Sequence, residues 1–285
     1  HTTNEFRRGG NKFDLEPFET DITEQTKHVI NSGGLTYDLF WKEYKHKLSF
    51  YTSAQHVDRN SYYGAQQDPN AYGKTKDLTF VGGGMYVGNF YKVLFSPATF
   101  TAGLEYSHNN MHDIMAGYNR DLEQKVRIAS AFFQNEWKMN DFTLLAGFRL
   151  DDHNLIENLI FSPRVNLLYK PSDALQGRLT WSTGFRAPQA YDEDLHVTAV
   201  GGEGVLIHLA DGLKPEKSNS FSGSVDLSGQ IGHFQTNLLI EGFYTALKDV
   251  FYLQNVGVDA QGNTLQERRN GSGANVYGVN PHISE

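Results

Sequence analysis

Residues 99–107 of the chain read Thr-Phe-Thr-Ala-Gly-Leu-Glu-Tyr-Ser, in which polar and apolar side chains alternate. Successive side chains of a β-strand point to opposite sides, so Phe100, Leu104 and Tyr106 would share one face of an extended segment. Polar residues such as Glu105 would share the other face. The stretch therefore predicts a β-strand with one apolar face and one polar face.

The same alternation recurs along the chain, with almost no helical pattern in between. Clusters of Gly, Asn, Asp and Pro divide the sequence into blocks of strand length. We expect strands at about 22–41, 45–60, 76–91, 98–112, 124–138, 141–152, 159–170, 174–186, 218–229, 232–252 and 264–279. This spacing predicts an antiparallel meander of roughly a dozen strands, as in membrane barrels.

The connections between these strands alternate in length. Tight turns are expected at 138–141, 171–174 and 229–232, and aromatic residues such as Trp137 and Tyr169 stand beside them. Long connections are expected at 7–21, 61–75, 113–123, 187–217 and 254–263. In outer-membrane barrels the short turns face the periplasm, the long loops face outside, and aromatic rings mark the membrane boundaries. We therefore expect all the long connections at one end of the sheet.

The composition narrows the possible functions. The chain has 285 residues, no cysteine and a formal net charge of -8. The missing thiols exclude disulfides and thiolate metal sites, and the negative charge argues against nucleic acid as a partner. No run of about eighteen apolar residues predicts a transmembrane helix. Because no Gly-x-Ser-x-Gly, His-Glu-x-x-His or phosphate-loop motif occurs, we expect no enzyme, no catalytic residue and no cofactor.

Two longer stretches carry a family resemblance. Residues 132–151 read Phe-Phe-Gln-Asn-Glu-Trp-Lys-Met-Asn-Asp-Phe-Thr-Leu-Leu-Ala-Gly-Phe-Arg-Leu-Asp, and they resemble a hairpin of TonB-dependent outer-membrane receptors. Asn135 stands where that hairpin usually has Asp, and Leu150 where it has an aromatic residue. Further family motifs are Ser162-Pro163-Arg164, Gly184-Phe185-Arg186-Ala187-Pro188 and Leu213-Lys214-Pro215-Glu216.

The resemblance implies an all-β fold, namely part of an antiparallel transmembrane β-barrel. Such barrels have about 22 strands and enclose a plug, so residues 1–285 would supply about half of one as a curved open sheet. We interpret the chain as an internal fragment of the barrel domain, without the plug domain and the last strands. Pro281 departs from the family pattern, because proline is unexpected inside a strand.

The resemblance also implies a function. Receptors of this family sit in the outer membrane of Gram-negative bacteria, bind a scarce nutrient at extracellular loops, and import it with energy transmitted through TonB. The implied cargo is an iron-siderophore complex or a vitamin such as cobalamin. The implied partners are the TonB complex, reached through the missing plug, and outer-membrane lipid or lipopolysaccharide. A passive porin or adhesin barrel and a soluble carbohydrate-binding β-sandwich are the alternatives.

A barrel wall predicts which way each side chain points. Charged side chains are costly against lipid and tolerable against a polar lumen. The residues expected on the convex, lipid-facing side are Phe100, Leu104, Phe133, Phe142, Leu144, Phe148, Val165, Leu167, Leu179 and Trp181. The residues expected on the concave side are Glu105, Gln134, Glu136, Arg149, Arg164, Asn166 and Arg178. The reverse arrangement would favour a soluble core.

Binding residues tend to sit on loops carried by a rigid scaffold. Arginine pairs beside flexible glycines can hold an anionic group, and tyrosines on a loop can stack on a ligand. The residues expected to contact cargo are Arg7, Arg8, Tyr62, Tyr63, Asp192, Asp194, Arg268 and Arg269. The arginines could equally belong to solvated loops, and the tyrosines could pack against neighbouring loop residues.

The segment Asp192-Glu193-Asp194-Leu195-His196 offers three carboxylates and an imidazole. Hard cations take several oxygen ligands, so this segment could bind a cation. It has no glycine at the spacing of a calcium loop, which favours a solvated acidic loop. The sequence therefore predicts no metal site here.

Overall fold

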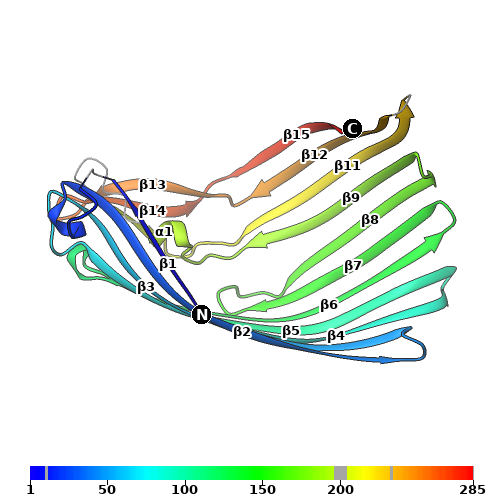
Figure 1. Ribbon diagram of the computed structural model, residues 1–285, viewed down its shortest axis with the longest axis horizontal. Coiled ribbons are helices and arrows are strands. Elements are labelled where there is room, and N and C mark those ends of the chain that lie inside the picture. The colour runs from blue at the N-terminus through cyan, green and yellow to red at the C-terminus, as the bar shows by residue number, and fades with distance from the viewer. Residues whose placement is uncertain (10–11, 196–203, 232–233, 285) are drawn as a thin grey trace.

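In the computed structural model, residues 1–9, 12–195, 204–231 and 234–284 are described. Within these ranges, twelve strands form one antiparallel sheet in which each strand pairs with the next. In spatial order they are β1 (Thr2–Arg8), β2 (Ile22–Trp41), β3 (His46–Ala65), β4 (Tyr72–Val93), β5 (Ser96–Met115), β6 (Arg120–Met139), β7 (Phe142–His153), β8 (Ile160–Ser172), β9 (Leu175–Arg186), β11 (Glu216–Ile231), β12 (Phe234–Lys248) and β15 (Gly273–Ser284). Figure 1 shows a curved sheet that does not close, with β1 and β15 at its edges. The expected all-β architecture is confirmed.

A second, smaller sheet lies at one end of the first. It consists of β10 (Val205–Leu209), β14 (Thr264–Asn270) and β13 (Phe251–Val258), with β10 parallel to β14 and β13 antiparallel to it. The helical turns in the described part are η1 (Pro17–Glu19), η2 (Ala116–Tyr118) and α1 (Asp192–Leu195). No helix among the described residues has the length and apolar character needed to cross a membrane.

The register of the main sheet separates its two faces. Glu105 pairs with Ser130 and Ser130 with Asp151, so these three polar residues share a face. Leu104, one position along, pairs with Ala131 on the other face. The polar face is concave, because Gln124 on that face is hydrogen-bonded to the segment before α1, which lies inside the curve (Figure 1). The register carries this assignment from β5 to β9. The ten residues expected on the convex side all lie there, and the seven expected on the concave side all lie there, so the expectation is confirmed.

Aromatic rings gather beside the tight turns at the end opposite the small sheet. The rings of Phe142 and Tyr169 stack at 4.6 Å between centroids, and those of Phe95 and Trp137 at 5.6 Å. The indole of Trp137 donates a hydrogen bond of 3.0 Å to the Val93 carbonyl oxygen. An amphipathic ring with one polar contact suits a membrane–water boundary. This arrangement fits an interfacial girdle.

The structure corrects the boundaries of two expected loops. Residues 61–65 continue β3 and residues 72–75 belong to β4, so the connection is 66–71 instead of 61–75. Residues 113–115 and 120–123 likewise belong to β5 and β6. The alternation of apolar and polar residues stops before the strands do. Strand pairing continues there because it depends on backbone hydrogen bonds and not on apolar side chains. These hairpins therefore extend well past the apolar band.

Two strands expected to be continuous are interrupted. The expected strand 232–252 is divided at Asp249, which has a φ of 53°, into β12 and β13. The expected strand 264–279 is divided at Gly271 into β14 and β15. The chain leaves the main sheet at these points to form the small sheet. The expected connection 254–263 is therefore mostly the strand β13, and the expected turn 229–232 begins as the strand β11.

Pro281 lies within β15 and pairs with Ile240 of β12. Strand β15 is an edge of the described sheet, where a missing backbone N–H is tolerated. The connections at 66–71, 116–119 and 259–263 lie at the same end as the small sheet, and the tight turns lie at the other end (Figure 1). The expected segregation of the connections is confirmed for the described residues.

Candidate functional site

A cavity of about 380 Å³ lies on the concave face at the loop end. The residues that line it are His28, Val57, Arg59, Thr75, Asp77, Asn109, Met111, Gln124, Gln189, Ala190, Tyr191 and Leu195. The first eight belong to β2–β6, the next three to the segment that leads into α1, and Leu195 to α1 itself. The cavity is thus enclosed between the barrel wall and a connection folded inward.

A buried charge network stands on the wall of this cavity. The Asp113 side chain is 1% exposed and accepts hydrogen bonds from Arg120 Nε at 2.8 Å and Thr75 Oγ1 at 2.5 Å. Arg59 Nη2 lies 3.5 Å from the same carboxylate. Two guanidinium groups thus approach one carboxylate. Arg120 Nη1 is buried without a hydrogen-bond partner among the described residues.

The inward-folded segment is held in place by hydrogen bonds to the wall. Gln124 donates to the Ala190 carbonyl oxygen at 3.1 Å and accepts from the Ala190 N–H at 2.7 Å. Arg120 Nη2 donates to the Leu195 carbonyl oxygen at 2.7 Å. These contacts fix a connection whose own backbone groups form little regular structure. The cavity is therefore a built feature of the fold.

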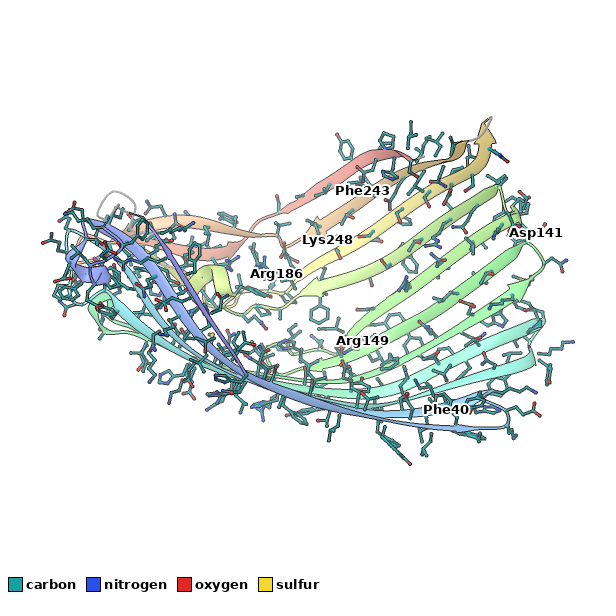
Figure 2. The ribbon with its side chains drawn as sticks, viewed as in Figure 1. Phe40, Asp141, Arg149, Arg186, Phe243 and Lys248 are labelled. Atoms are coloured by element: carbon teal, nitrogen blue, oxygen red, sulfur yellow. The ribbon has the colours of Figure 1, made fainter. Side chains whose placement is uncertain are left out.

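A second cluster, of arginines and aromatic rings, stands beside the cavity. Arg186, labelled in Figure 2, has its guanidinium carbon 3.9 Å from the Tyr191 ring centroid and 5.7 Å from that of Phe251. The Arg268 guanidinium lies 6.0 Å and 5.9 Å from the same two rings. Burial is the main cause that raises the pKa of Tyr191, so its hydroxyl stays neutral at ordinary pH and donates to the Ala187 carbonyl oxygen at 2.7 Å. This cluster presents positive charge and aromatic faces together.

Of the residues expected to bind cargo, the structure brings two together. Asp194 in α1 and Arg268 in β14 form an ion pair in which the two side chains are 2% and 6% exposed. Arg8 is exposed and pairs with Glu24, whereas Arg7 donates to the Phe13 carbonyl oxygen at 3.2 Å. Arg269 is exposed and pairs with Glu267. These side chains lie at the loop end, and none of them lines the cavity between the wall and the inward-folded segment.

Tyr62 and Tyr63 lie in β3 and are almost fully buried, at 1% and 4% exposure. The Tyr62 hydroxyl donates to the Asp68 carbonyl oxygen at 2.9 Å. Tyr63 packs with Met115 and Leu206 in the buried apolar cluster at this end. Both tyrosines therefore pack against neighbouring residues, which is the alternative that the sequence left open.

The acidic segment before residue 196 does not assemble a metal site among the described residues, where no group of three potential ligands meets. Asp194 is engaged by Arg268 and by the Tyr191 N–H, the latter at 2.8 Å. His196 and the side chain of Asp192 lie outside the described residues.

Sequence reasoning missed the residues that form the cavity network, namely Arg59, Asp113 and Arg120. The signal was available, since Arg59 lies an even number of positions from Tyr51 on the concave face of β3. Asp113 and Arg120 lie just outside the expected strands 98–112 and 124–138, so the sequence does not assign them to the same face as Arg59. In the sequence, Arg186 stands out only as part of a family motif, and its stacking on Tyr191 is not visible from the spacing.

A curved antiparallel sheet with an apolar convex face, a charged concave face and an aromatic girdle defines a transmembrane β-barrel protein. The family model described as TonB dependent receptor-like, beta-barrel matches residues 2–280. The chain therefore belongs to the TonB-dependent receptor β-barrel family, whose barrels lie in the outer membrane of Gram-negative bacteria.

The fold is shared with solved siderophore receptors. The siderophore receptor PirA from Pseudomonas aeruginosa matches with a TM-score of 0.73 at 17% identity, over 91% of this chain and 48% of PirA. PirA from Acinetobacter baumannii matches with a TM-score of 0.69 at 17% identity, over 93% of this chain and 42% of that receptor. The ferric enterobactin receptor PfeA from P. aeruginosa, in a mutant form, matches with a TM-score of 0.67 at 16% identity, over 93% of this chain and 41% of PfeA. The chain thus spans less than half of these receptors, and no curated protein matches it.

Proposed function

We propose that this chain forms part of an outer-membrane receptor that binds a ferric siderophore and imports it with energy supplied through TonB. The observation that carries the proposal is the concave cavity at the loop end, which Arg59 and Tyr191 line, with the Arg186 guanidinium stacked on the Tyr191 ring. Guanidinium groups bind carboxylate and other oxygen anions through paired hydrogen bonds, and aromatic faces hold planar or cationic groups. An anionic, aromatic iron chelate fits this combination.

Similar receptors support the cargo class. PfeA has been solved in complex with enterobactin, and its fold matches this chain with a TM-score of 0.67 at 17% identity. Cobalamin, the other cargo class considered, has no counterpart among the similar structures named above.

The TonB complex is the proposed energy source, reached through a plug inside the barrel. A plug would meet the concave face, where Arg149 donates to Glu105 at 2.9 Å and to Asp151 at 2.8 Å. Such a paired but partly exposed network suits a polar interface that must form and separate.

Among the residues expected from the sequence, we propose two different roles. Asp194 and Arg268 hold α1 against the small sheet and so shape the cavity. Arg7, Arg8 and Arg269 lie at the loop end and remain candidates for the first encounter with an anionic cargo.

The test is binding and uptake by the full-length receptor of a ferric catecholate siderophore, a ferric hydroxamate siderophore and cobalamin. We expect Arg186→Gln to weaken binding of one ferric siderophore by tenfold or more, since a hydrogen bond to a charged group contributes about 1.5–3 kcal/mol. Arg178→Gln, on the same face of the same strand but farther from the cavity, is the matched control. Shortening residues 187–217 with the barrel still folded should abolish uptake. Binding of cobalamin alone, or unchanged siderophore affinity in Arg186→Gln and in the shortened loop, would refute the proposal.

A further inference from the structure

Strands β8 and β9 separate at the loop end of the wall. They pair from Arg164 and Ser182 toward the turn end, whereas residues 160–163 of β8 and 183–186 of β9 lie outside this ladder. There β8 is paired with β7 and β9 with β11, so the ends of β8 and β9 diverge in Figure 1. Pro163 is the first residue past the last pair and has no backbone N–H to donate to a neighbouring strand. We call the opening between these two strand ends the seam.

A cavity of about 950 Å³ occupies the seam. Ser162 and Gly184, which line it, belong to the concave face by the alternation of their strands, whereas Phe161 and Phe185 belong to the convex face. Because residues of both faces line one cavity, the cavity extends through the wall. Its outer mouth is apolar, since Leu159 and Phe161 are 67% and 59% exposed.

The ring of Phe185 lies in the seam. His153 shares the concave face of β7 with Asp151, whereas Phe185 is on the convex face of β9. Their rings are nevertheless 6.3 Å apart between centroids, at an angle of 86°. The two rings meet because β8 starts opposite Asp151 and does not extend as far as His153. A change in the rotamer of one side chain, Phe185, can therefore widen the seam.

The seam lies at the height of the outer leaflet. Gly177 of β9 pairs with Tyr169 of the aromatic girdle, and Phe185 is eight residues farther along the strand. At about 3.3 Å per residue and a strand tilt of about 40°, this corresponds to a height of about 20 Å within an apolar band of about 25 Å. Lys217 is the cross-strand partner of Phe185, and Lys248 is that of Lys217. Because lysines near a membrane boundary extend toward the head groups, the seam opens just below the outer head groups.

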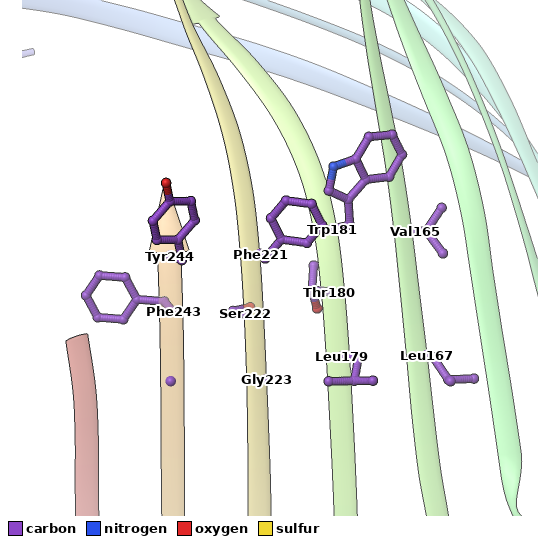
Figure 3. A pocket seen from close by; sticks show the side chains of 11 residues that line it. Val165, Leu167, Leu179, Thr180, Trp181, Phe221, Ser222, Gly223, Phe243 and Tyr244 are labelled. Atoms are coloured by element: carbon purple, nitrogen blue, oxygen red, sulfur yellow. The ribbon is translucent and has the colours of Figure 1, made fainter. Parts of the chain in front are cut away.

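Toward the turn end, the convex surface beside the seam is closed and apolar. Trp181 of β9 pairs with Val165 of β8 and with Phe221 of β11, and Figure 3 shows these side chains on adjacent strands. The Leu179 side chain covers Gly223, where an added Cβ atom would lie 3.1 Å from Leu179 Cδ2. The seam is therefore a local opening beside the apolar surface of β8, β9 and β11.

On the concave side, the seam adjoins the site proposed above. Arg186 directly follows Phe185 on β9, so the two side chains point to opposite faces. The Arg186 guanidinium stacks on Tyr191, which lines the concave cavity. A group held at Arg186 therefore lies next to an opening through the wall.

We propose that the cargo is an acylated ferric siderophore, with its anionic head at Arg186 and Tyr191 and its acyl chain in the seam and the outer leaflet. This inference rests on the proposed function and adds a substrate class to the same site. Acyl chains leave water favourably for apolar surroundings, and both the mouth of the seam and the lipid beyond it are apolar. A molecule with one anionic end and one apolar end fits a basic site that adjoins an apolar opening.

The experiment uses the full-length receptor in phospholipid nanodiscs and measures binding of a ferric catecholate and a ferric hydroxamate siderophore, each with and without one myristoyl chain. Residues 1–285 contain no cysteine, so Ser162→Cys combined with Gly184→Cys places one thiol on each side of the seam. A short bifunctional methanethiosulfonate reagent joins the two thiols, and a reductant releases them. We expect the cross-link to weaken binding of the acylated form by about tenfold or more and to leave the unacylated form unchanged. Reduction should restore the affinity.

The matched control joins the same strands on the same face where they already pair, through Asn166→Cys with Thr180→Cys, and should change neither affinity. Phe185→Trp enlarges the ring in the seam and should weaken binding of the acylated form without any cross-link. Folding of every variant is checked by the heat-dependent shift of the barrel on denaturing gels.

Three outcomes would overturn the inference and leave the ferric-siderophore proposal intact. They are an unchanged affinity for the acylated form after the seam is cross-linked, an equal loss for both forms, and an equal loss in the control. The first is also the result expected if a membrane lipid fills the seam. Failure of every ligand to bind would instead refute the proposed function, and this inference with it.

Discussion

Asp194 and Arg268 are 74 residues apart in the chain, yet their side chains form an ion pair that is almost fully buried. The pair joins α1 to β14 and so connects the inward-folded segment to the small sheet. Removing one partner of a buried pair leaves an uncompensated charge, which costs about 3–5 kcal/mol. The docking of α1 therefore depends on a contact between distant parts of the sequence.

The first prediction concerns this pair. Asp194→Asn should increase hydrogen exchange at the Ala190 amide, because the segment is released from the wall when its anchor fails. The exchange of amides in β3–β5 should stay unchanged. Glu267→Gln disrupts the exposed pair with Arg269 and is the control, since exposed pairs contribute about 0–1 kcal/mol. Equal effects of the two substitutions would show that the buried pair does not hold the segment.

The second prediction concerns the two faces of β5. Leu104→Arg should lower the free energy of unfolding by about 2–4 kcal/mol, as expected for arginine against lipid near the membrane midplane. Thr101→Arg, three residues away on the concave face, should change it much less. The measurement is urea unfolding of the barrel in phospholipid vesicles. A larger loss in Thr101→Arg would reverse the assignment of the faces.

The third prediction concerns Arg149, which donates to Glu105, Asp151 and Ser130 at 2.9, 2.8 and 2.6 Å. Arg149→Met leaves the buried Asp151 without its guanidinium and should destabilise the barrel by roughly 2–3 kcal/mol. This figure is below that of a fully buried pair, because Arg149 is 38% exposed. Arg149→Lys keeps the charge but loses the planar fork, so its loss should be smaller. Equal losses in the same unfolding assay would show that charge is irrelevant here.

The fourth prediction concerns pH. Burial is the main cause that raises the pKa of Tyr118 from 10.0 to about 12, and its hydroxyl donates to the Tyr63 carbonyl oxygen. A raised folded-state pKa means that the folded protein binds more protons than the unfolded chain between these values. The contribution of the protonated Tyr118 hydroxyl to the free energy of unfolding is therefore complete below pH 10 and is lost as the pH rises to about 12. The difference in phenolate absorbance between wild type and Tyr118→Phe should titrate in that upper range, and a midpoint near 10 would contradict the assignment.

The fifth prediction concerns the tight turns. Leu94 has a φ of 63° and Asn140 a φ of 45°, although only asparagine among these two tolerates the left-handed region well. Leu94→Asn should therefore stabilise the barrel by roughly 1 kcal/mol, and Asn140→Leu should destabilise it by a similar amount. Urea unfolding measures both. Changes of the same sign would indicate that packing of the Leu94 side chain outweighs backbone strain.

The facing of residues in the barrel wall could be predicted from the sequence, because side-chain direction in a strand depends only on the positions of neighbouring residues. Leu104 and Glu105 face opposite sides whatever the rest of the chain does, and the same holds for Phe133 and Gln134. Strand ends were predicted less well. The alternation of apolar and polar residues weakens at Tyr62 and Tyr63, which predicts a loop there. In the structure β3 continues to Ala65, and both rings are buried.

The sequence by itself determined which side of each strand faces lipid, which connections are tight, and the family to which the chain is similar. Those properties follow from the two-residue period of a strand and from short motifs. Only the tertiary structure decided that Arg59, Asp113 and Arg120 form one network, that Asp194 meets Arg268, and that Lys217 faces Lys248. Each of these contacts depends on register between strands or on a connection that folds inward, and neither is encoded in any single stretch of residues.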